Sequence, residues 1–274
     1  MIQYSEKDTI LYVDKLSVGY GQKPVLKDIN MVIKNVVREG HASTGQVVAI
    51  IGRSGRGKST LFKALTGLIK PTSGQILITD MRTSDVNDAK IIEEGDMGFV
   101  DQKYTLFRHK TVEDIMHYAM RKSAMKKEEK EALITKYLDE WGLSEHRKKY
   151  SCELSGGQRQ RTAIIEQILS SKHFMILDEP FSGLDVGNIE RVKQAFERIK
   201  DDNEYNTIIF STHDIKLAIE LADVIYIIGF PEGTTEYSTI VKHYDLKAMG
   251  LAWTEYKDNH RIVFNEIKEL LLKS

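Results

Sequence analysis

The chain has 274 residues, a length between one and two domains at ~150 residues per domain. With 41% hydrophobic and 29% charged residues, its composition is that of a globular protein and excludes wholesale disorder or a fibrous repeat. The formal net charge of -1 argues against a strongly basic nucleic-acid binder, and the single cysteine, Cys152, cannot form an internal disulfide, which suits a reducing compartment.

The sequence contains no candidate for a membrane-spanning segment. Its longest stretch without Asp, Glu, Lys or Arg covers residues 40–52, only 13 residues. A spanning helix needs ~20 apolar residues. The first residues include acidic side chains and lack the apolar core of a signal peptide. We therefore expect a soluble, intracellular protein.

The first third predicts short strands over residues 9–14, 16–20 and 28–33, which alternate apolar and polar residues or are β-branched. Residues 47–51 (VVAII) are continuously apolar, as in a strand buried on both faces. A glycine-rich turn follows, and then a predicted helix that Gly67 would end.

Three further buried-strand runs lie in the second half, over residues 174–177, 207–211 and 224–228. Predicted helices separate them, over residues 188–200 and 214–221. Strands and helices that alternate in this way predict a parallel sheet covered by helices.

The middle and the end of the chain differ from this pattern. Residues 111–150 contain helix patterns and no convincing strand, which predicts a small helical subdomain inserted into the α/β core. After Pro231 come a turn, a possible strand over residues 238–244 and a closing amphipathic helix over residues 265–273. These last residues are too few for an independent domain.

The glycine-rich turn matches the P-loop pattern and stands between a buried strand and a helix, as that pattern requires. Its residues are Gly52, Arg53, Ser54, Gly55, Arg56, Gly57, Lys58, Ser59 and Thr60. In such a turn, backbone N–H groups and the helix N-terminus surround a phosphate chain. Lys58 would reach the β- and γ-phosphates, and the Ser59 hydroxyl would bind Mg²⁺. A glycine-rich turn without a ligand is the alternative, which this many residues at fixed spacing disfavour.

The apolar strand over residues 174–177 ends in two carboxylates. In the same sheet as a P-loop, Asp178 would lie beside Mg²⁺, and Glu179 would act as general base on the attacking water. Alone this motif is weak, but together with the P-loop it predicts an ATPase or GTPase. Guanine-specifying residues of the NKxD type are not apparent, which favours ATP.

Residues 154–158 read LSGGQ and open a predicted helix in a basic context. A helix N-terminus of this kind is a second anion site. One nucleotide does not need two such sites from one chain. We therefore expect the second site to close on the γ-phosphate of ATP held by another subunit. Its residues are Ser155, Gly156, Gly157 and Gln158.

From about residue 9 to about residue 229, these motifs resemble the ATP-binding cassette (ABC) family, whose signature sequence is LSGGQ. The resemblance implies that Tyr20 stacks on adenine and that Gln102 links the metal to the helical subdomain. It implies that His213 contacts the γ-phosphate and that Asp185 lies in a loop at the dimer interface. One departure from the family is a longer connection over residues 35–44.

The resemblance also implies the fold class: an α/β P-loop NTPase core with an N-terminal antiparallel β element and an inserted helical subdomain. The predicted division is one ABC ATPase domain over residues 9–230, with the subdomain inserted at about 103–165, and a short C-terminal extension over residues 231–274.

The function that the resemblance implies is the ATPase subunit of a transporter, with ATP and Mg²⁺ as ligands. Its expected partners are a second copy in a head-to-tail dimer and separate transmembrane permease subunits, without nucleic acid. Its expected location is peripheral, at the cytoplasmic face of the cell membrane. Residues 211–229 are similar to those of importers of small polar solutes. A lipid-trafficking or export complex and a soluble ABC ATPase outside transport are the alternatives, and the transported substrate is not readable from this chain.

Overall fold

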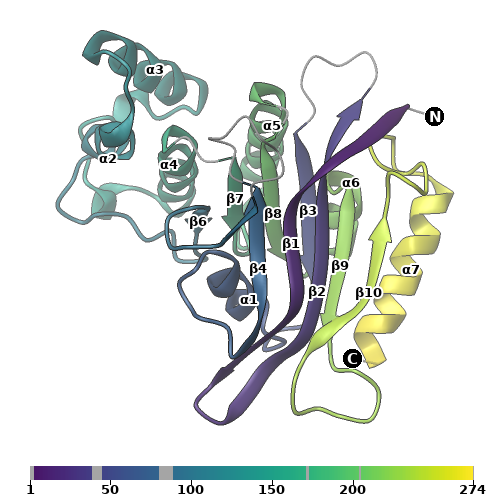
Figure 1. Ribbon diagram of the computed structural model, residues 1–274. Helices are drawn as coiled ribbons and strands as arrows, with labels where there is room; N and C mark the ends of the chain where they lie inside the picture. Colours follow the sequence, from purple (N-terminus) through teal and green to yellow (C-terminus); the bar gives the residue numbers. More distant parts are fainter. Residues whose placement is uncertain (1–2, 39–44, 80–88, 171–172, 204, 274) are drawn as a thin grey trace.

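The computed structural model describes residues 3–38, 45–79, 89–170, 173–203 and 205–273, which form two sheets and their covering helices (Figure 1). The central sheet has the strand order β10-β9-β3-β8-β7-β6. Its strands are β3 (Gln46–Ile51), β6 (Gly98–Val100), β7 (Phe174–Leu177), β8 (Thr207–Thr212), β9 (Val224–Gly229) and β10 (Thr239–Asp245). All neighbours are parallel except β10, which runs antiparallel to β9. The predicted parallel sheet is therefore confirmed.

The second sheet is antiparallel, with the order β2-β1-β4-β5. Its strands are β1 (Tyr4–Tyr20), β2 (Lys23–Arg38), β4 (Ser73–Thr79) and β5 (Ala89–Ile91). The sequence predicted two separate strands over residues 9–14 and 16–20, but the structure has one continuous strand, β1. Lys15, with a φ of 44°, lies at an irregularity in the pairing with β2, which interrupts the sequence pattern but does not end the strand. β2 includes the first part of the predicted long connection, while residues 39–44 lie outside the described residues.

The helices fall into two groups. The central sheet is covered by α1 (Lys58–Leu65), α5 (Val186–Asp202), α6 (Ile215–Leu221) and α7 (Asp258–Lys273). To one side lie α2 (Val112–Ala119), α3 (Lys127–Glu140) and α4 (Gly156–Leu169), where the sequence predicted helices (Figure 1). α4 packs against both α2 and β6, and α7 packs against α6. The domain boundaries given above remain a prediction.

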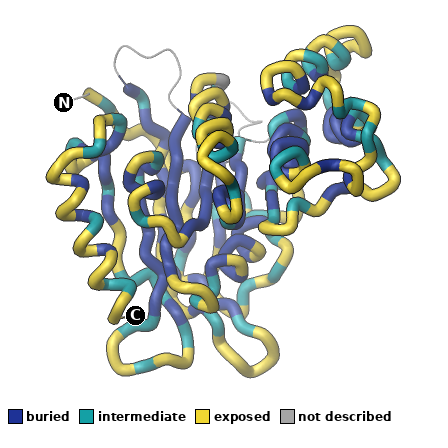
Figure 2. The backbone as a smooth tube through the Cα atoms, turned by 180° about the vertical axis from the view of Figure 1, so that it is seen from behind, coloured by how far each residue is buried: buried dark blue, intermediate teal, exposed yellow. Residues whose placement is uncertain are grey.

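Alternation along β3 explains why one sheet carries two apolar cores. Val47, Ala49 and Ile51 face a cluster formed with α4, α5 and α6. Val48 and Ile50 face a cluster formed with α1 and the antiparallel sheet. Because both faces are covered, every residue of β3 is buried (Figure 2).

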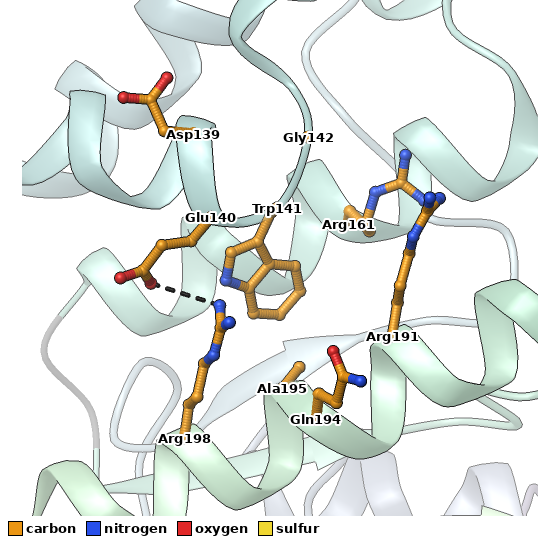
Figure 3. Close-up of a pocket in the computed structure, with 9 residues that line it drawn as sticks. All are labelled: Asp139, Glu140, Trp141, Gly142, Arg161, Arg191, Gln194, Ala195 and Arg198. Atoms are coloured by element: carbon orange, nitrogen blue, oxygen red, sulfur yellow. Dashed lines mark hydrogen bonds and ion pairs between the residues drawn. The ribbon is translucent and has the colours of Figure 1, made fainter.

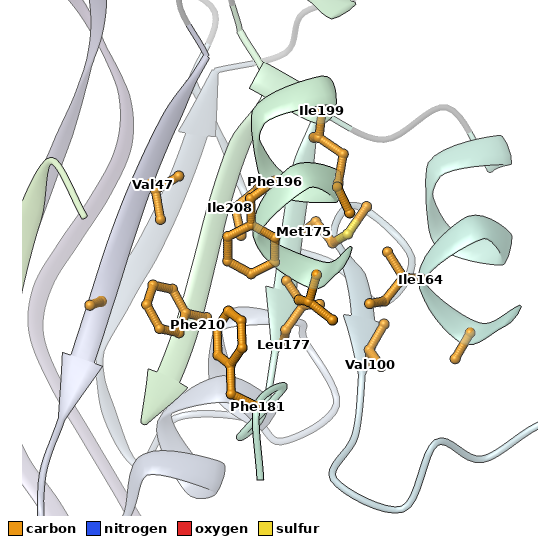
Figure 4. Close-up of a cluster of buried hydrophobic side chains, with 14 of the residues drawn as sticks. Val47, Val100, Ile164, Met175, Leu177, Phe181, Phe196, Ile199, Ile208 and Phe210 are labelled. Atoms are coloured by element: carbon orange, nitrogen blue, oxygen red, sulfur yellow. The ribbon is translucent and has the colours of Figure 1, made fainter. Parts of the chain in front are cut away.

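An aromatic group anchors α5 to the central sheet (Figure 4). Phe196 on α5 and Phe210 on β8 have ring centroids 5.6 Å apart, and both rings meet Phe181 edge to face. Edge-to-face pairs of this kind add to the free energy gained by burial. They fix the loop that follows β7, which carries the predicted catalytic carboxylate.

Within the described ranges, no helix has both the length and the apolar character needed to cross a membrane.

Candidate functional site

The turn between β3 and α1 has the geometry of a phosphate cradle. Gly55 and Gly57 have φ angles of 80° and 89°, which favour glycine. A Cβ on Gly57 would lie 2.7 Å from Leu26 Cδ2, and one on Gly52 would lie 2.6 Å from the Ile228 carbonyl oxygen. No side chain caps α1, so its first N–H groups remain available to an anion.

Lys58 begins α1 and turns back over this cradle. Its side chain is 8% exposed, and Nζ donates a hydrogen bond of 2.7 Å to the Gly52 carbonyl oxygen. Nζ also lies 3.5 Å from Oε1 of Glu179. The predicted phosphate-binding lysine and the predicted general base are therefore neighbours across the sheet edge.

Glu179 is the second residue after β7, with a φ of 51° that turns its side chain out of the strand. Its Oε2 lies 3.0 Å from Nδ1 of His213, which follows β8. The carboxylate is 13% exposed and the imidazole 72% exposed, so the pair opens to solvent on the histidine side. The C-terminal ends of parallel strands are where α/β folds bind ligands.

Ser211 is a site residue that the sequence analysis did not identify. Its hydroxyl donates to Asp178 Oδ1 at 2.6 Å and accepts from the Glu179 backbone N–H at 2.8 Å. It thereby fixes the Asp178 carboxylate and the Glu179 backbone relative to β8. The only sequence signal was its place at the end of a predicted strand, because the pairing of β7 with β8 is not local in the chain.

Tyr104 was also missed. Its hydroxyl is buried and has no hydrogen-bond partner among the described residues. Burial, followed by the nearby carboxylates of Asp101 and Glu179, raises the pKa of Tyr104 to about 12, so the phenol keeps its proton. An unpartnered donor near the predicted base is unusual in a folded protein. In the sequence, only its position two residues after Gln102 could have indicated that Tyr104 lies near the site.

The LSGGQ segment lies at the start of α4 and is already capped. Ser155 Oγ accepts from the Gln158 backbone N–H at 3.3 Å, and Gln158 Oε1 accepts from the Ser155 backbone N–H at 2.9 Å. The sequence predicted exposed backbone amides here. The capping box satisfies one of them internally, so fewer remain for a ligand than at α1.

Gln160, on the same helix, ties this segment to the carboxylate loop. Its side-chain amide is buried and donates a hydrogen bond to the Pro180 carbonyl oxygen, next to Glu179. Asp185 caps α5 by accepting from the Asn188 backbone N–H at 2.8 Å. The start of α4 is thus held against the loop between β7 and α5.

The predicted site residues form one close group and several outlying positions. Lys58, Asp178, Glu179 and His213 are brought together at the carboxyl ends of the strands. No hydrogen bond or ion pair within the described ranges joins this group to residues 155–158. The Gln102 side chain is exposed in the turn after β6. Tyr20 is exposed at the end of the β1–β2 hairpin.

A second group of ligand-type side chains lies between α2 and α3. In the described part of the chain, Glu113, His117 and Glu131 alone hold their ligand atoms close enough together for a metal ion. The Arg147 guanidinium, however, donates to both carboxylates, and Lys148 pairs with Glu113. Hydrogen bonds from Lys148 and Arg147 hold the pKa of Glu113 below its ordinary value. An ion-pair cluster therefore explains this group without a metal.

Comparison with known proteins gives a consistent result. The family model described as "ABC transporter" matches residues 39–182. A sulfate/thiosulfate import ATP-binding protein of Agrobacterium fabrum is 34% identical over 221 residues, which cover 79% of this chain and 60% of that protein. Its counterpart in Synechococcus elongatus is 32% identical over 226 residues, 82% of this chain and 61% of that protein. The chain thus spans about 60% of the length of these curated relatives.

Solved structures agree over most of their length. The protein cbiO1 of Clostridium perfringens, part of an ABC transporter complex, superimposes with a TM-score of 0.68 at 28% identity, covering 89% of this chain and 91% of that one. A dimeric bacterial ABC transporter cassette gives a TM-score of 0.68 at 25% identity, covering 86% and 99%. The same cassette is also known as a post-hydrolysis dimer bound to ADP and Pi, with a TM-score of 0.67.

Proposed function

The chain belongs to the ABC transporter family, and from this we propose that it is the subunit that binds and hydrolyses ATP to drive a transporter. One observation carries the proposal. The Glu179 carboxylate lies between the Lys58 ammonium, 3.5 Å away, and the His213 imidazole, 3.0 Å away, beside an uncapped helix N-terminus. A base, a cation and a phosphate cradle at one sheet edge are what ATP hydrolysis requires.

ATP would lie with its phosphates along residues 52–60 and with its adenine near Tyr20. Lys58 Nζ, which contacts the Gly52 carbonyl in this structure, would turn to the β- and γ-phosphates. Glu179 would take a proton from the attacking water, and His213 would contact the γ-phosphate from the far side. The exposed side of the Glu179–His213 pair leaves a path for that water.

The residues around Asp178 fit a magnesium ion. Hydroxyl and carboxylate oxygens are the ligands that Mg²⁺ prefers, and Ser59 and Asp178 supply them. Asp178 Oδ1 is held by Ser211, whereas Oδ2 accepts no hydrogen bond within the described ranges. Gln102 would add an amide oxygen from the turn after β6. The ion, when bound, would neutralise charge on the β- and γ-phosphates.

We also propose a head-to-tail dimer as the working form. Among the described residues, no hydrogen bond or ion pair links residues 155–158 to Lys58, Asp178, Glu179 or His213, so a second copy would have to bring its own signature segment to each nucleotide. Asp185, in the loop before α5, would then lie at the interface. The dimeric cassettes that resemble this fold support this arrangement.

The cargo we propose is a small polar solute, carried inward. The relatives named as sulfate/thiosulfate import ATP-binding proteins support import over lipid trafficking, export or a role outside transport. Separate transmembrane permease subunits would hold this chain at the cytoplasmic face of the membrane. Nucleic acid has no part in the proposed function.

The test is the Glu179→Gln variant, with Glu128→Gln, an exposed carboxylate on α3, as its control. Loss of the base should stop hydrolysis while ATP binding persists. The variant should therefore form an ATP-bound dimer in size-exclusion chromatography, and ATPase activity should fall ~100-fold or more. A Glu179→Gln protein that hydrolyses ATP at the rate of the control would remove the basis of the proposal.

A further inference from the structure

A cavity of about 270 Å³ lies between the end of α3, α4 and α5, away from residues 52–60 (Figure 3). Its lining includes Trp141, which follows α3, Arg161 from α4, and Arg191 and Arg198 from α5. Three guanidinium groups around one small cavity are a concentrated positive charge. Nothing in the proposed ATPase mechanism uses them.

Two of these arginines lack an acidic partner. Arg161 and Arg191 point toward one another (Figure 3), and each Nη1 donates to the same Asn188 Oδ1, at 3.0 and 3.4 Å. That acceptor is a neutral amide. In the described ranges, no carboxylate oxygen lies within ion-pair distance of either guanidinium. Burial and the charge of Arg191 lower the pKa of Arg161, and the opposing effect of the Asp185 carboxylate, which forms no ion pair with it, is smaller.

The acidic residues that line the cavity are occupied elsewhere. Glu140 Oε2 pairs with Arg198 at 3.4 Å, at the other end of the cavity. Asp139 accepts a hydrogen bond from the Ser144 hydroxyl. The end of the cavity formed by Arg161 and Arg191 therefore keeps its positive charge.

A buried donor in the same place also lacks an acceptor. Arg161 is only 7% exposed, and its Nε has no hydrogen-bond partner among the described residues. Buried polar groups are almost always hydrogen-bonded, so an unpaired charged donor beside a cavity points to an acceptor that binds there.

We propose that this cavity is a binding site for a tetrahedral inorganic oxyanion of the sulfate or phosphate type, held between Arg161 and Arg191. Each planar guanidinium group can donate two parallel hydrogen bonds to a pair of oxygens of such an ion, and its positive charge favours an anion over a cation or a neutral solute. Trp141 forms the wall beside it. Asn188 also donates from Nδ2 to Asp185 at 2.8 Å, so the bound ion would contact the residues that fix the start of α5.

The experiment uses Trp141 as the reporter. The chain has two tryptophans, so Trp253→Phe leaves Trp141 as the single emitter. The nucleotide-free protein is titrated with sodium sulfate and, separately, with sodium phosphate, against sodium chloride at matched ionic strength. Both oxyanions should produce a saturable change in emission that chloride does not. Should that variant fold poorly, calorimetric titration of the Lys58→Ala chain with both tryptophans gives the affinity instead, because this change weakens oxyanion binding at residues 52–60.

Arg191→Gln identifies the site, because Arg191 is exposed and its loss should not affect folding. Loss of one charge-assisted contact should weaken oxyanion binding about tenfold or more. Arg261→Gln, an exposed arginine on α7, should leave the affinity unchanged. Lys58→Ala should also leave it unchanged, which separates this site from residues 52–60 and from the outcome of any ATPase assay. Equal affinity in the Arg191→Gln variant and the parent, or no saturation beyond chloride, would overturn the proposal.

Discussion

Two helices in this molecule begin with glycine-rich segments, and they satisfy their first N–H groups in different ways. At α1, Gly57 has a φ of 89° and no side chain caps the helix. At α4, Ser155 and Gln158 form a reciprocal capping box. The N-terminus of α1 therefore depends on an external acceptor, whereas at α4 the capping box satisfies the Gln158 N–H internally and leaves fewer N–H groups for a ligand.

This difference indicates how the two segments divide the work of binding. The turn before α1 has the features that a phosphate cradle needs: Lys58 supplies positive charge, and at Gly52 a Cβ would lie only 2.6 Å from the Ile228 carbonyl oxygen. The start of α4 is a stable, exposed surface with a hydroxyl and two glycines. We expect it to engage a nucleotide only when another copy of the chain carries one to it. The predictions below test this division.

Lys58→Ala should give the largest effect on activity. The variant removes the one ammonium that contacts both the cradle and Glu179. We expect kcat/KM for ATP to fall by ~100-fold or more, with weaker binding of ATP in equilibrium titration. Lys63→Ala, an exposed lysine on the same helix, should behave like the wild type. Equal losses in the two variants would contradict a specific role for Lys58.

Gly57→Ala and Gly156→Ala compare the two helix starts directly. A Cβ on Gly57 meets Leu26 Cδ2 at 2.7 Å and forces a left-handed alanine, so the free energy of unfolding should fall by about 2 kcal/mol. A Cβ on Gly156 meets nothing within 4 Å, so the stability of that variant should stay within ~0.5 kcal/mol of wild type. Urea denaturation measures both. Gly156→Ala should instead lower the ATPase rate, because the added methyl group would lie against the nucleotide of the second copy in the dimer.

The elements that the sequence predicted well are those whose burial is continuous. Strands β3, β7, β8 and β9 are apolar on both faces because helices or a second sheet cover each side, and such runs are visible in the sequence. The three-residue strands β5 and β6 and the partly exposed β4 were missed. Their identity depends on the strands beside them, not on their own pattern.

The same distinction holds for the site. Lys58 was predicted from the P-loop pattern and Glu179 from the carboxylates that follow a buried strand, whereas His213 rested on the resemblance to the ABC family. Their proximity follows from the parallel strands, which bring their carboxyl ends together. The links between them were not predicted. Across the β7–β8 pair, Ser211 joins the Asp178 carboxylate and the Glu179 backbone N–H, and Gln160 reaches Pro180 from α4. These contacts join residues far apart in sequence, through tertiary packing that no local pattern encodes.

Glu166, near the end of α4, should make the free energy of unfolding depend on pH. Burial raises the pKa of its carboxyl to about 7, against the lowering effect of Arg121. Between about pH 4.5 and about pH 7, Glu166 is protonated in the folded state and ionised in the unfolded state. Because the folded state binds the extra proton, the free energy of unfolding falls as the pH rises through this range. Glu166→Gln should remove this loss. At pH 8 it should raise the free energy of unfolding by on the order of 2 kcal/mol, with little change at pH 4.5, as measured by urea denaturation at both values. An equal gain at both values would exclude titration of Glu166 as the cause.

Ser155 gives a smaller change in stability than Glu166 and the finest test of the comparison. Ser155→Ala removes the cap of α4 and should cost about 1 kcal/mol, whereas Ser155→Asn keeps a capping side chain and should cost a few tenths at most. If the hydroxyl serves only the helix, ATPase activity should follow stability and recover in Ser155→Asn. If it also contacts a nucleotide held by a second copy, both variants should lose activity while each still binds ATP through residues 52–60. We expect the second outcome, because the capping box uses the oxygen of Ser155 as an acceptor and leaves its O–H available to donate to phosphate.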